Sequence, residues 1–211
     1  MSMRMLLALT ALMASGTPNV AKLILKPAQV GPGYVLIRRS DGNGVVNTVT
    51  LDLCGRGGYP SEGLRATRLQ VNYLKPRSPI WISNEVVTYR PGGAVQAMRE
   101  VAQHADHCPT HPIDSGEAGL PKLLFTITRI HDSRLLTGAV AVKVRVRGTV
   151  KGKTVDQISY GVYQRFGNVL SGTYSFAIGP NTPAQRILAL HAAEQSARNL
   201  LHGGNAGTPT A

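Results

Sequence analysis

Apolar and polar residues alternate along several short segments of the chain, which is the pattern of half-buried β-strands. The alternation is clearest over residues 68–74, where Leu69, Val71 and Tyr73 fall on one face and polar side chains fall on the other. Similar segments, bounded by glycine, proline and asparagine, predict further strands. These strands are expected at residues 34–39, 45–53, 80–89, 122–130, 139–150, 155–166 and 169–178.

Two longer segments have the apolar spacing of α-helices instead. The first follows Pro91-Gly92-Gly93 and ends before Cys108. The second begins with Thr182 as its N-cap and Pro183 at its first position, and it runs to about His202. The residues expected to be buried are Val95, Met98, Ala102 and Ala105 in the first helix, and Ile187, Leu190, Ala197 and Leu201 in the second.

The order of these elements predicts an α+β fold, in which two main helices pack on antiparallel sheet. Residues 15–202 are expected to form a single domain with two similar halves, about 22–115 and 116–202. Residues 203–211 begin with the helix-stopping Gly203 and are expected to form a disordered tail.

The hairpin around residues 151–153 can form in two registers. A three-residue loop places the valines of residues 142–146 on the face that carries Tyr160, whereas a two-residue loop places them beside Gln157, Ser159 and Gly161. The hydrophobic pattern favours the three-residue loop, because a shift by one residue moves every side chain to the opposite face. Tyr174 then falls on the other face, so either a bulge intervenes or both faces of the sheet are covered.

The first residues have the pattern of an export signal. Arg4 precedes an apolar run over residues 5–14, which ends in Leu12-Met13-Ala14, a sequence that a signal peptidase could accept. The run is too short to span a bilayer. Residues 1–14 are therefore a candidate signal peptide, and an extracellular or cell-envelope location is expected. A cytosolic protein with an incidental apolar start is the alternative.

The chain is strongly basic, with 23 Lys and Arg against 11 Asp and Glu and a net charge of +12. Such an excess favours anionic partners, which could be a small molecule, a wall polymer or lipid headgroups contacted at the membrane surface. Aromatic residues make up only 5%, which argues against a nucleic-acid platform built on base stacking. The densest basic patch is Lys143, Arg145 and Arg147, which share one strand face and are either candidate ligand-binding residues or a solvated outer surface.

Two cysteines, Cys54 and Cys108, favour a disulfide in an exported protein. A metal site is the rival interpretation, because histidines 104, 107 and 111 and Asp106 crowd around Cys108. Prolines 109 and 112 break any helix that could align these ligands. One disulfide is therefore expected, without a metal or a cofactor.

Local catalytic signatures are absent from the sequence. It contains no G-x-S-x-G, S-x-x-K or H-E-x-x-H motif and no phosphate-binding loop. A non-catalytic protein is expected, and a secreted hydrolase whose catalytic residues are dispersed along the chain is the alternative.

Several short segments of the sequence resemble segments of known proteins: Leu51-Asp52-Leu53-Cys54, Tyr59-Pro60-Ser61-Glu62, residues 65–71 and 83–89, Pro91-Gly92-Gly93-Ala94 and Cys108-Pro109. They resemble actinobacterial exported proteins of unassigned role and, more distantly, the PknH-like extracellular sensor domains of receptor kinases. The resemblance implies helices packed on an antiparallel sheet, with a ligand cleft and no enzymatic activity. The chain carries one cysteine pair where the kinase-linked domain carries two, and no kinase domain.

Within the matching stretch, five polar residues lie in or beside predicted strands, where burial would require hydrogen-bonded partners. They are candidate ligand-binding residues or structural ones: Arg68, Ser83, Asn84, Glu85 and Tyr89. The sequence thus predicts an exported, non-catalytic, ligand-binding or sensor-like protein of the cell envelope, with a cytosolic basic binding protein as a further alternative.

Overall fold

The structure is a computed structural model, and it describes residues 18–41, 53–54, 59–114, 121–177 and 183–204. The candidate signal peptide, most of the strand expected at residues 45–53 and residues 205–211 lie outside these ranges. The elements are α1 (Val20–Leu23), α2 (Pro27–Val30), β1 (Val35–Asp41), η2 (Pro60–Leu64), β2 (Arg65–Leu74), β3 (Ile80–Tyr89), α3 (Gly93–Asp106), β4 (Leu124–Ile130), β5 (Val140–Val150), β6 (Lys153–Phe166), β7 (Val169–Ala177) and α4 (Pro183–Gly204).

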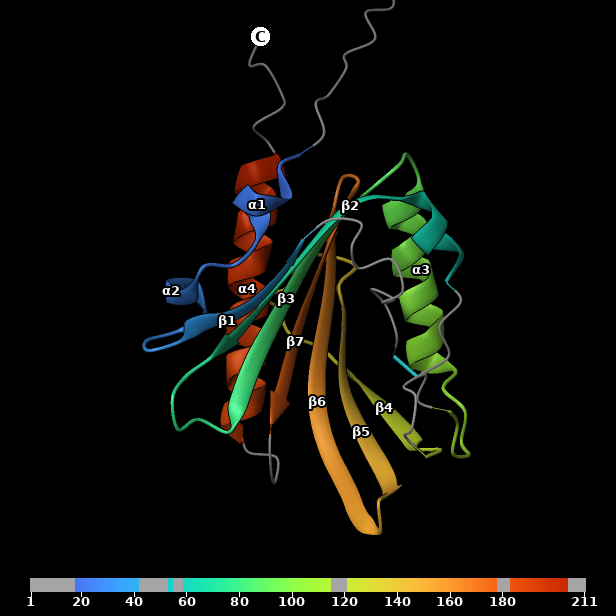
Figure 1. Cartoon of the computed structure of the whole chain (residues 1–211). Helices are drawn as coiled ribbons and strands as arrows, with labels where there is room; N and C mark the ends of the chain where they lie inside the picture. Colours follow the sequence, from blue (N-terminus) through green and yellow to red (C-terminus); the bar gives the residue numbers. More distant parts are fainter. Residues whose placement is uncertain (1–17, 42–52, 55–58, 115–120, 178–182, 205–211) are drawn as a thin grey trace, which may run out of the picture.

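The described strands form one antiparallel sheet with the order β1-β2-β3-β7-β6-β5-β4. Helix α3 packs on one face of the sheet and α4 on the other (Figure 1). The expected α+β class, with two main helices on antiparallel sheet, is confirmed. In each half of the chain a hairpin leads into a helix, and the last strands of the two hairpins, β3 and β7, pair at the centre of the sheet.

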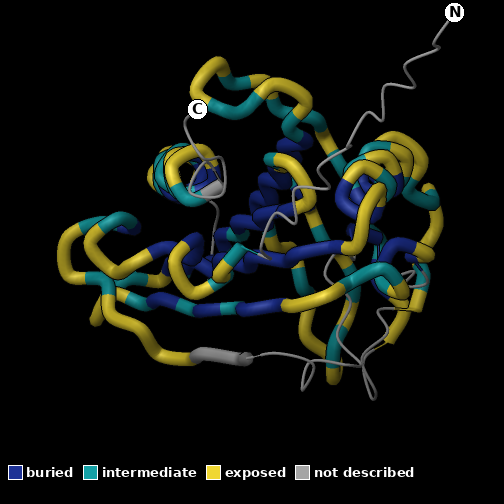
Figure 2. The backbone as a smooth tube through the Cα atoms, turned by 90° about the horizontal axis from the view of Figure 1, so that it is seen from above, coloured by how far each residue is buried: buried dark blue, intermediate teal, exposed yellow. Residues whose placement is uncertain are grey.

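The alternation predicted for residues 68–74 is confirmed in β2, where Leu69, Val71 and Tyr73 are buried on the α4 face. Strand β3 begins and ends at the predicted residues, 80 and 89. Nine of its ten residues are buried because side chains on both faces lie under other elements. Burial is concentrated in this way where the sheet runs between the two helices (Figure 2).

The register predicted for the β5–β6 hairpin is wrong. Val150 pairs with Lys153, which leaves a two-residue turn and places the β5 valines opposite Gly161, Ser159 and Gln157. Lys151 and Gly152 both have positive φ angles, 48° and 74°, as the favoured two-residue hairpin turn requires.

Gly161 of β6 lies opposite Val142, and two tyrosine rings border the space where its side chain would be. A side chain at Gly161 would contact the rings of Tyr163 and Tyr174, which fill the space above it. Tyr174 and the valines therefore lie on the α3 face, and Tyr160 lies on the opposite face. The conflict between Tyr174 and the valines, which suggested a bulge or two covered faces, therefore came from the wrong register. The β6–β7 pairing has no bulge, and both α3 and α4 contact these strands.

The predicted buried faces of the two helices are confirmed only in part. Val95 of α3 is 44% exposed, whereas the neighbouring Ala94 is fully buried, and Ile187 of α4 is 64% exposed. The reason is that each helix approaches the sheet through small side chains, which permit a close contact. Of the predicted residues, Ala105, Leu190 and Ala197 are buried, Met98 and Ala102 are partly buried against the α3-side core, and Leu201 is exposed. The buried apolar residues are Ala94, Ala97, Val101 and Ala105 in α3, and Ala189, Leu190, Ala192, Ala193, Ala197 and Leu200 in α4.

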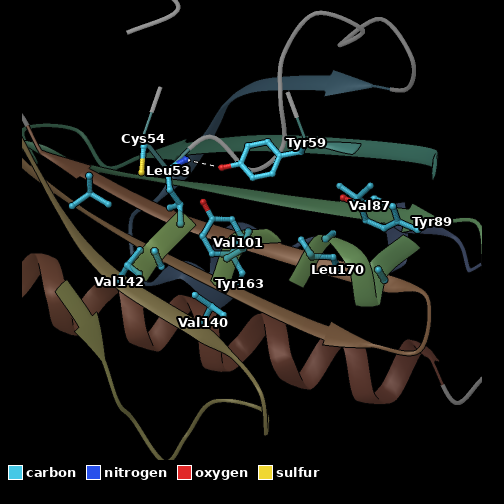
Figure 3. Close-up of a cluster of buried hydrophobic side chains, with 14 residues drawn as sticks. Leu53, Cys54, Tyr59, Val87, Tyr89, Val101, Val140, Val142, Tyr163 and Leu170 are labelled. Carbon is cyan, nitrogen blue, oxygen red and sulfur yellow. Dashed lines mark hydrogen bonds between the residues drawn. The ribbon is translucent and has the colours of Figure 1, made fainter. Parts of the chain in front are cut away.

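The core on the α3 face joins the helix to the centre of the sheet (Figure 3). Val101 of α3 packs in the same cluster as Val142, Tyr163 and Leu170 from three different strands. The helix starts at Gly93, where a Cβ atom would lie 2.9 Å from the Cβ atoms of Leu64 and Tyr89. Only glycine therefore lets the chain turn this closely from β3 into α3.

The core on the α4 face includes the first described segment of the chain. Leu23, Leu25 and Val30 are buried in one cluster with Leu200 near the end of α4. Asn199 Nδ2 donates a hydrogen bond to the Leu23 carbonyl oxygen at 3.2 Å. Helices α1 and α2 are thus held against α4 rather than forming a separate layer. Among the described residues, no helix combines the length and apolar character needed to cross a membrane.

The expected disulfide joins Cys54 to Cys108, just beyond the end of α3. Cys108, His104 and Asp106 are among the residues that suggested a metal site, and each has another partner. His104 Nδ1 lies 3.0 Å from the Tyr59 hydroxyl, and Asp106 accepts two hydrogen bonds of 2.8 Å from Arg129 of β4. The Arg129 guanidinium lowers the pKa of Asp106. Both contacts hold the C-terminal end of α3 in place.

Removing the disulfide is expected to destabilise the protein substantially. Replacing both Cys54 and Cys108 with Ser releases a loop whose closure entropy corresponds to about 4 kcal/mol in the chain-entropy model. The free energy of unfolding in urea should fall by this amount, and Tm should fall by roughly 10 °C. Ser61→Ala, which leaves the disulfide intact, serves to separate the covalent effect from a local polar one. Equal unfolding curves for the double variant and the wild type would contradict the expectation.

Candidate functional site

A pocket of about 590 Å³ lies between the start of α4, the turn that joins β2 to β3, and the segment that follows α2. These three segments lie together at the left of Figure 1. Such a volume is typical of sites for small molecules. We call it the α4 pocket, and it is lined by residues 30–32, Tyr34, residues 75–78, Ile80 and four α4 residues, namely Ala184, Ile187, Leu188 and His191.

The walls of the α4 pocket are mainly apolar. Val30 and Ile80 are buried at its inner side, and Leu188 of α4 faces them. The Tyr34 hydroxyl donates a hydrogen bond to the Ile80 carbonyl oxygen at 3.4 Å. Burial raises the pKa of Tyr34, so its phenol remains neutral and keeps this proton. The inner wall is therefore uncharged.

The rim of the α4 pocket is basic. Lys75 and Arg77 come from the β2–β3 turn, His191 comes from α4, and no lining residue is acidic. None of these three side chains forms an ion pair with a described residue. The Lys75 stem crosses Gly33, where a Cβ atom would lie 3.3 Å from the Lys75 Cε atom. Positive charge thus borders an apolar cavity without a neutralising neighbour in the described chain.

The turn that carries Lys75 and Arg77 is tight. Ser78 N donates to the Lys75 carbonyl oxygen at 2.9 Å, and Pro76 occupies the second position of this four-residue turn. Arg77, at the third position, has φ = 66°, so the turn is of type II. Glycine is the favoured residue at that position, because a side chain is strained there. An arginine therefore occupies a place in the pocket rim that is unfavourable for its backbone.

Sequence reasoning did not identify the α4 pocket. Its residues come from separate segments that meet only in the folded molecule. The available signal was Lys75-Pro76-Arg77-Ser78, a turn with two basic residues and no glycine at its third position.

Asn84, a predicted candidate, lies on the α4 face of the sheet and is completely buried. Its Nδ2 atom donates at 3.0 Å to both Ser171 Oγ and the Gly172 carbonyl oxygen, and its Oδ1 atom accepts from Leu25 N at 2.9 Å. Ser171 Oγ lies 2.6 Å from Ser196 Oγ of α4. Asn84 thus links the first described segment, two central strands and α4 in one buried network.

Arg68 and Glu85 lie on the opposite, α3 face and form an ion pair in which both side chains are almost fully buried. The Tyr174 hydroxyl donates to Glu85 Oε2 at 3.3 Å. Burial raises the pKa of Tyr174 well above its ordinary value, so the phenol keeps its proton for this bond. Gly172 lies opposite Glu85, and any side chain there would collide with the Tyr174 hydroxyl. Ser83, also buried, accepts a hydrogen bond from Gln70 Nε2 at 3.0 Å.

The other candidates lie apart from these residues. Tyr89 is buried beside α3, and burial raises the pKa of its phenol, whose oxygen has no hydrogen-bond partner among the described residues. Lys143, Arg145 and Arg147 share one face of β5, as predicted, and this is the face opposite the β5 valines. Arg145 donates to Asp156 at 2.7 and 2.5 Å, which lowers the pKa of that carboxyl. The predicted residues therefore do not converge on one site, and none of them lines the α4 pocket.

Removing only one partner of the buried Arg68–Glu85 ion pair is expected to destabilise the protein strongly. Arg68→Met leaves Glu85 without its charged partner and should lower the free energy of unfolding by about 3–5 kcal/mol. Adding Glu85→Leu should restore most of this loss, because the orphaned charge is gone. Arg198→Met is the control, since its exposed pair with Glu194 should contribute about 0.5 kcal/mol or less. Urea unfolding measures all four proteins, and a double variant that is as unstable as Arg68→Met, or less stable, would contradict this expectation.

The sequence matches no family model, and no curated protein matches it. Among solved structures, the chain is similar to the extracellular domain of PknH from Mycobacterium tuberculosis, with a TM-score of 0.54 and 10% identity over 84% of this chain and 94% of that chain. It also matches an uncharacterized protein of Mycobacterium smegmatis, the Rv0999 ortholog, with a TM-score of 0.40 and 13% identity over 88% of this chain and 100% of that chain. The expected resemblance to PknH-like sensor domains is thus confirmed at the level of the fold: the chain has the fold of the PknH extracellular domain.

Proposed function

We propose that this protein is an exported, non-catalytic binding domain that takes a small ligand into the α4 pocket. The observation that carries the proposal is the pocket itself, about 590 Å³ of mainly apolar space with three basic groups at its rim. A concave apolar site with a few polar groups is the usual form of a ligand site. The fold shared with the extracellular domain of PknH is consistent with a binding role.

The chemistry of the pocket lining also supports a binding role. Ser78 and His191 are the lining residues closest in type to a nucleophile and a general base. However, the Ser78 hydroxyl donates to the Ile80 carbonyl oxygen at 3.3 Å, and no lining carboxylate is present to orient His191. A hydrolytic mechanism would need such an arrangement. We therefore favour binding over hydrolysis.

Export is supported by two features. The apolar run of residues 5–14 has the composition of a signal sequence. The Cys54–Cys108 disulfide is a bond that persists mainly in oxidising compartments. Both agree with a protein that works outside the cytoplasm, in the cell envelope or beyond it.

Blocking the α4 pocket should abolish ligand uptake without unfolding the protein. Ala184 is exposed in the first turn of α4 and lines the pocket, so Ala184→Trp places an indole in the cavity. We expect it to weaken the binding of Nile red, a neutral apolar fluorophore, by about tenfold or more, which corresponds to 1.4 kcal/mol. Val95→Trp, on the exposed side of α3, should leave binding unchanged. Equal binding by the two variants, with native circular dichroism, would refute the assignment of this pocket.

Export can be tested on protein expressed from its full gene in an actinobacterial host. Intact mass and N-terminal sequencing of material from the culture medium should show a start near Ser15 and a mass two hydrogens below that of the reduced chain. Full-length protein that stays in the cytoplasm with both thiols open to alkylation would contradict export. The same material, reduced and then alkylated at Cys54 and Cys108, provides the mass reference for the unbridged chain.

A further inference from the structure

We infer that the ligand of the α4 pocket is an amphipathic anion, whose apolar chain lies along Val30, Ile80 and Leu188 and whose acidic headgroup is held by Lys75 and Arg77. This inference rests on the proposed function and specifies the chemical class of the ligand. It follows from three observations on separate parts of the pocket, which concern its wall, its charge and the backbone of its rim.

The wall calls for an apolar group. Val30 and Ile80 are buried at the inner side, and Leu188 closes the cavity from α4. Ile187, beside it at the mouth, is 64% exposed, although large aliphatic side chains are among those most often buried. An alkyl chain that enters between these residues would remove both the cavity surface and the Ile187 side chain from water. A small polar anion alone would leave this surface unused.

The charge calls for an acidic group. Lys75 and Arg77 extend from the turn on one side of the pocket, and His191 faces them from α4. No acidic residue lines the cavity, and none of the described carboxylates pairs with these three groups. A guanidinium and an ammonium near one another suit a phosphate or carboxylate, which can accept hydrogen bonds from both. The neutral Tyr34 phenol does not oppose this charge.

The backbone of the rim supports a ligand role for Arg77 in particular. Arg77 and Lys151 are the only non-glycine residues with positive φ in the described part of the chain. A residue held in this strained region suggests a functional reason for its retention. In the type II turn a glycine would relieve the strain but would remove a cation from the pocket rim. Arg77 is therefore retained in spite of its backbone strain, and a role in anion binding explains why.

The test compares two ligands that share one chain, decyl phosphate and decanol, below their aggregation limits. Wild-type protein should bind decyl phosphate at least about tenfold more tightly in calorimetry, a difference of 1.4 kcal/mol. Lys75→Gln with Arg77→Asn should remove that preference and leave decanol binding unchanged. Asparagine is chosen because it tolerates the left-handed backbone. Octyl phosphate should bind more weakly than decyl phosphate, by about fourfold for each methylene lost from the pocket, which corresponds to 0.8 kcal/mol.

The chain offers a closely matched control. Lys151→Asn with Lys153→Gln also removes two positive charges and also changes a positive-φ residue, but in the β5–β6 turn outside the pocket. This control should keep the full preference for decyl phosphate. If it loses the preference as the pocket variant does, net charge alone attracts the anion and the inference is wrong. If wild-type protein binds decanol as tightly as decyl phosphate, the inference is likewise wrong, while Nile red binding blocked by Ala184→Trp would leave the proposed function standing.

Two further measurements sharpen the result. Arg77→Gly should raise Tm because it relieves the turn, yet it should weaken decyl phosphate binding; Lys151→Gly should raise Tm without weakening it. If both glycine variants bind decyl phosphate as tightly as the wild type, Arg77 does not hold the headgroup. Vesicles of phosphatidylglycerol in phosphatidylcholine identify the source of the anion. Sedimentation that depends on Lys75 and Arg77 indicates a membrane lipid, and binding of free decyl phosphate alone indicates a soluble amphiphile; both support the inference.

Discussion

Both faces of the sheet are buried at its central strands, β3 and β7, and this constraint determines which partners polar side chains can have there. In β3, the neighbours Asn84 and Glu85 point to opposite faces, and each is buried under a different layer. Neither has access to water, so each must find hydrogen-bond partners within its own layer. Asn84 bonds to the first described segment and to β7, while Glu85 pairs with Arg68 and accepts from Tyr174. The two layers are thereby fixed relative to the same strand.

This arrangement explains what could be predicted from the sequence. Strand β2 has one clearly apolar face, so its alternation identified Leu69, Val71 and Tyr73 correctly. Strand β6 carries apolar residues on both faces, so the valines of β5 can be matched to either face of β6, and there the pattern alone chose the wrong register. The positive φ angles of the two turn residues, rather than the valines, decide that hairpin. Val95, Ile187 and Leu201 were wrongly predicted to be buried, because the helices contact the sheet largely through alanines, which contribute little to an apolar pattern.

The candidate site was less predictable than the fold. Arg68, Asn84 and Glu85 drew attention as polar residues in strands, and in the structure their hydrogen bonds go to other protein groups. The α4 pocket instead joins a helix, a turn and the segment after α2, and no periodicity relates these segments in the chain. Lys75 and Arg77 lie on a turn at the edge of the scaffold, so their charge can face a ligand without disturbing the buried layers. A rigid core with a binding site at its periphery is a common arrangement for binding proteins.

The packing of the first described segment against the end of α4 also bears on how the chain reaches its native state. Leu23 and Leu25 share their cluster with Leu200, and Gln29 Nε2 donates to Asn199 Oδ1 at 2.7 Å, across 170 positions. A ribosome synthesises Leu23 and Leu25 long before Leu200, so these leucines lack their native neighbours until α4 has emerged. Contacts of such high sequence separation form slowly. This layer can therefore assemble only after α4 has been synthesised, which leaves Leu23, Leu25 and Val30 without their native packing until then.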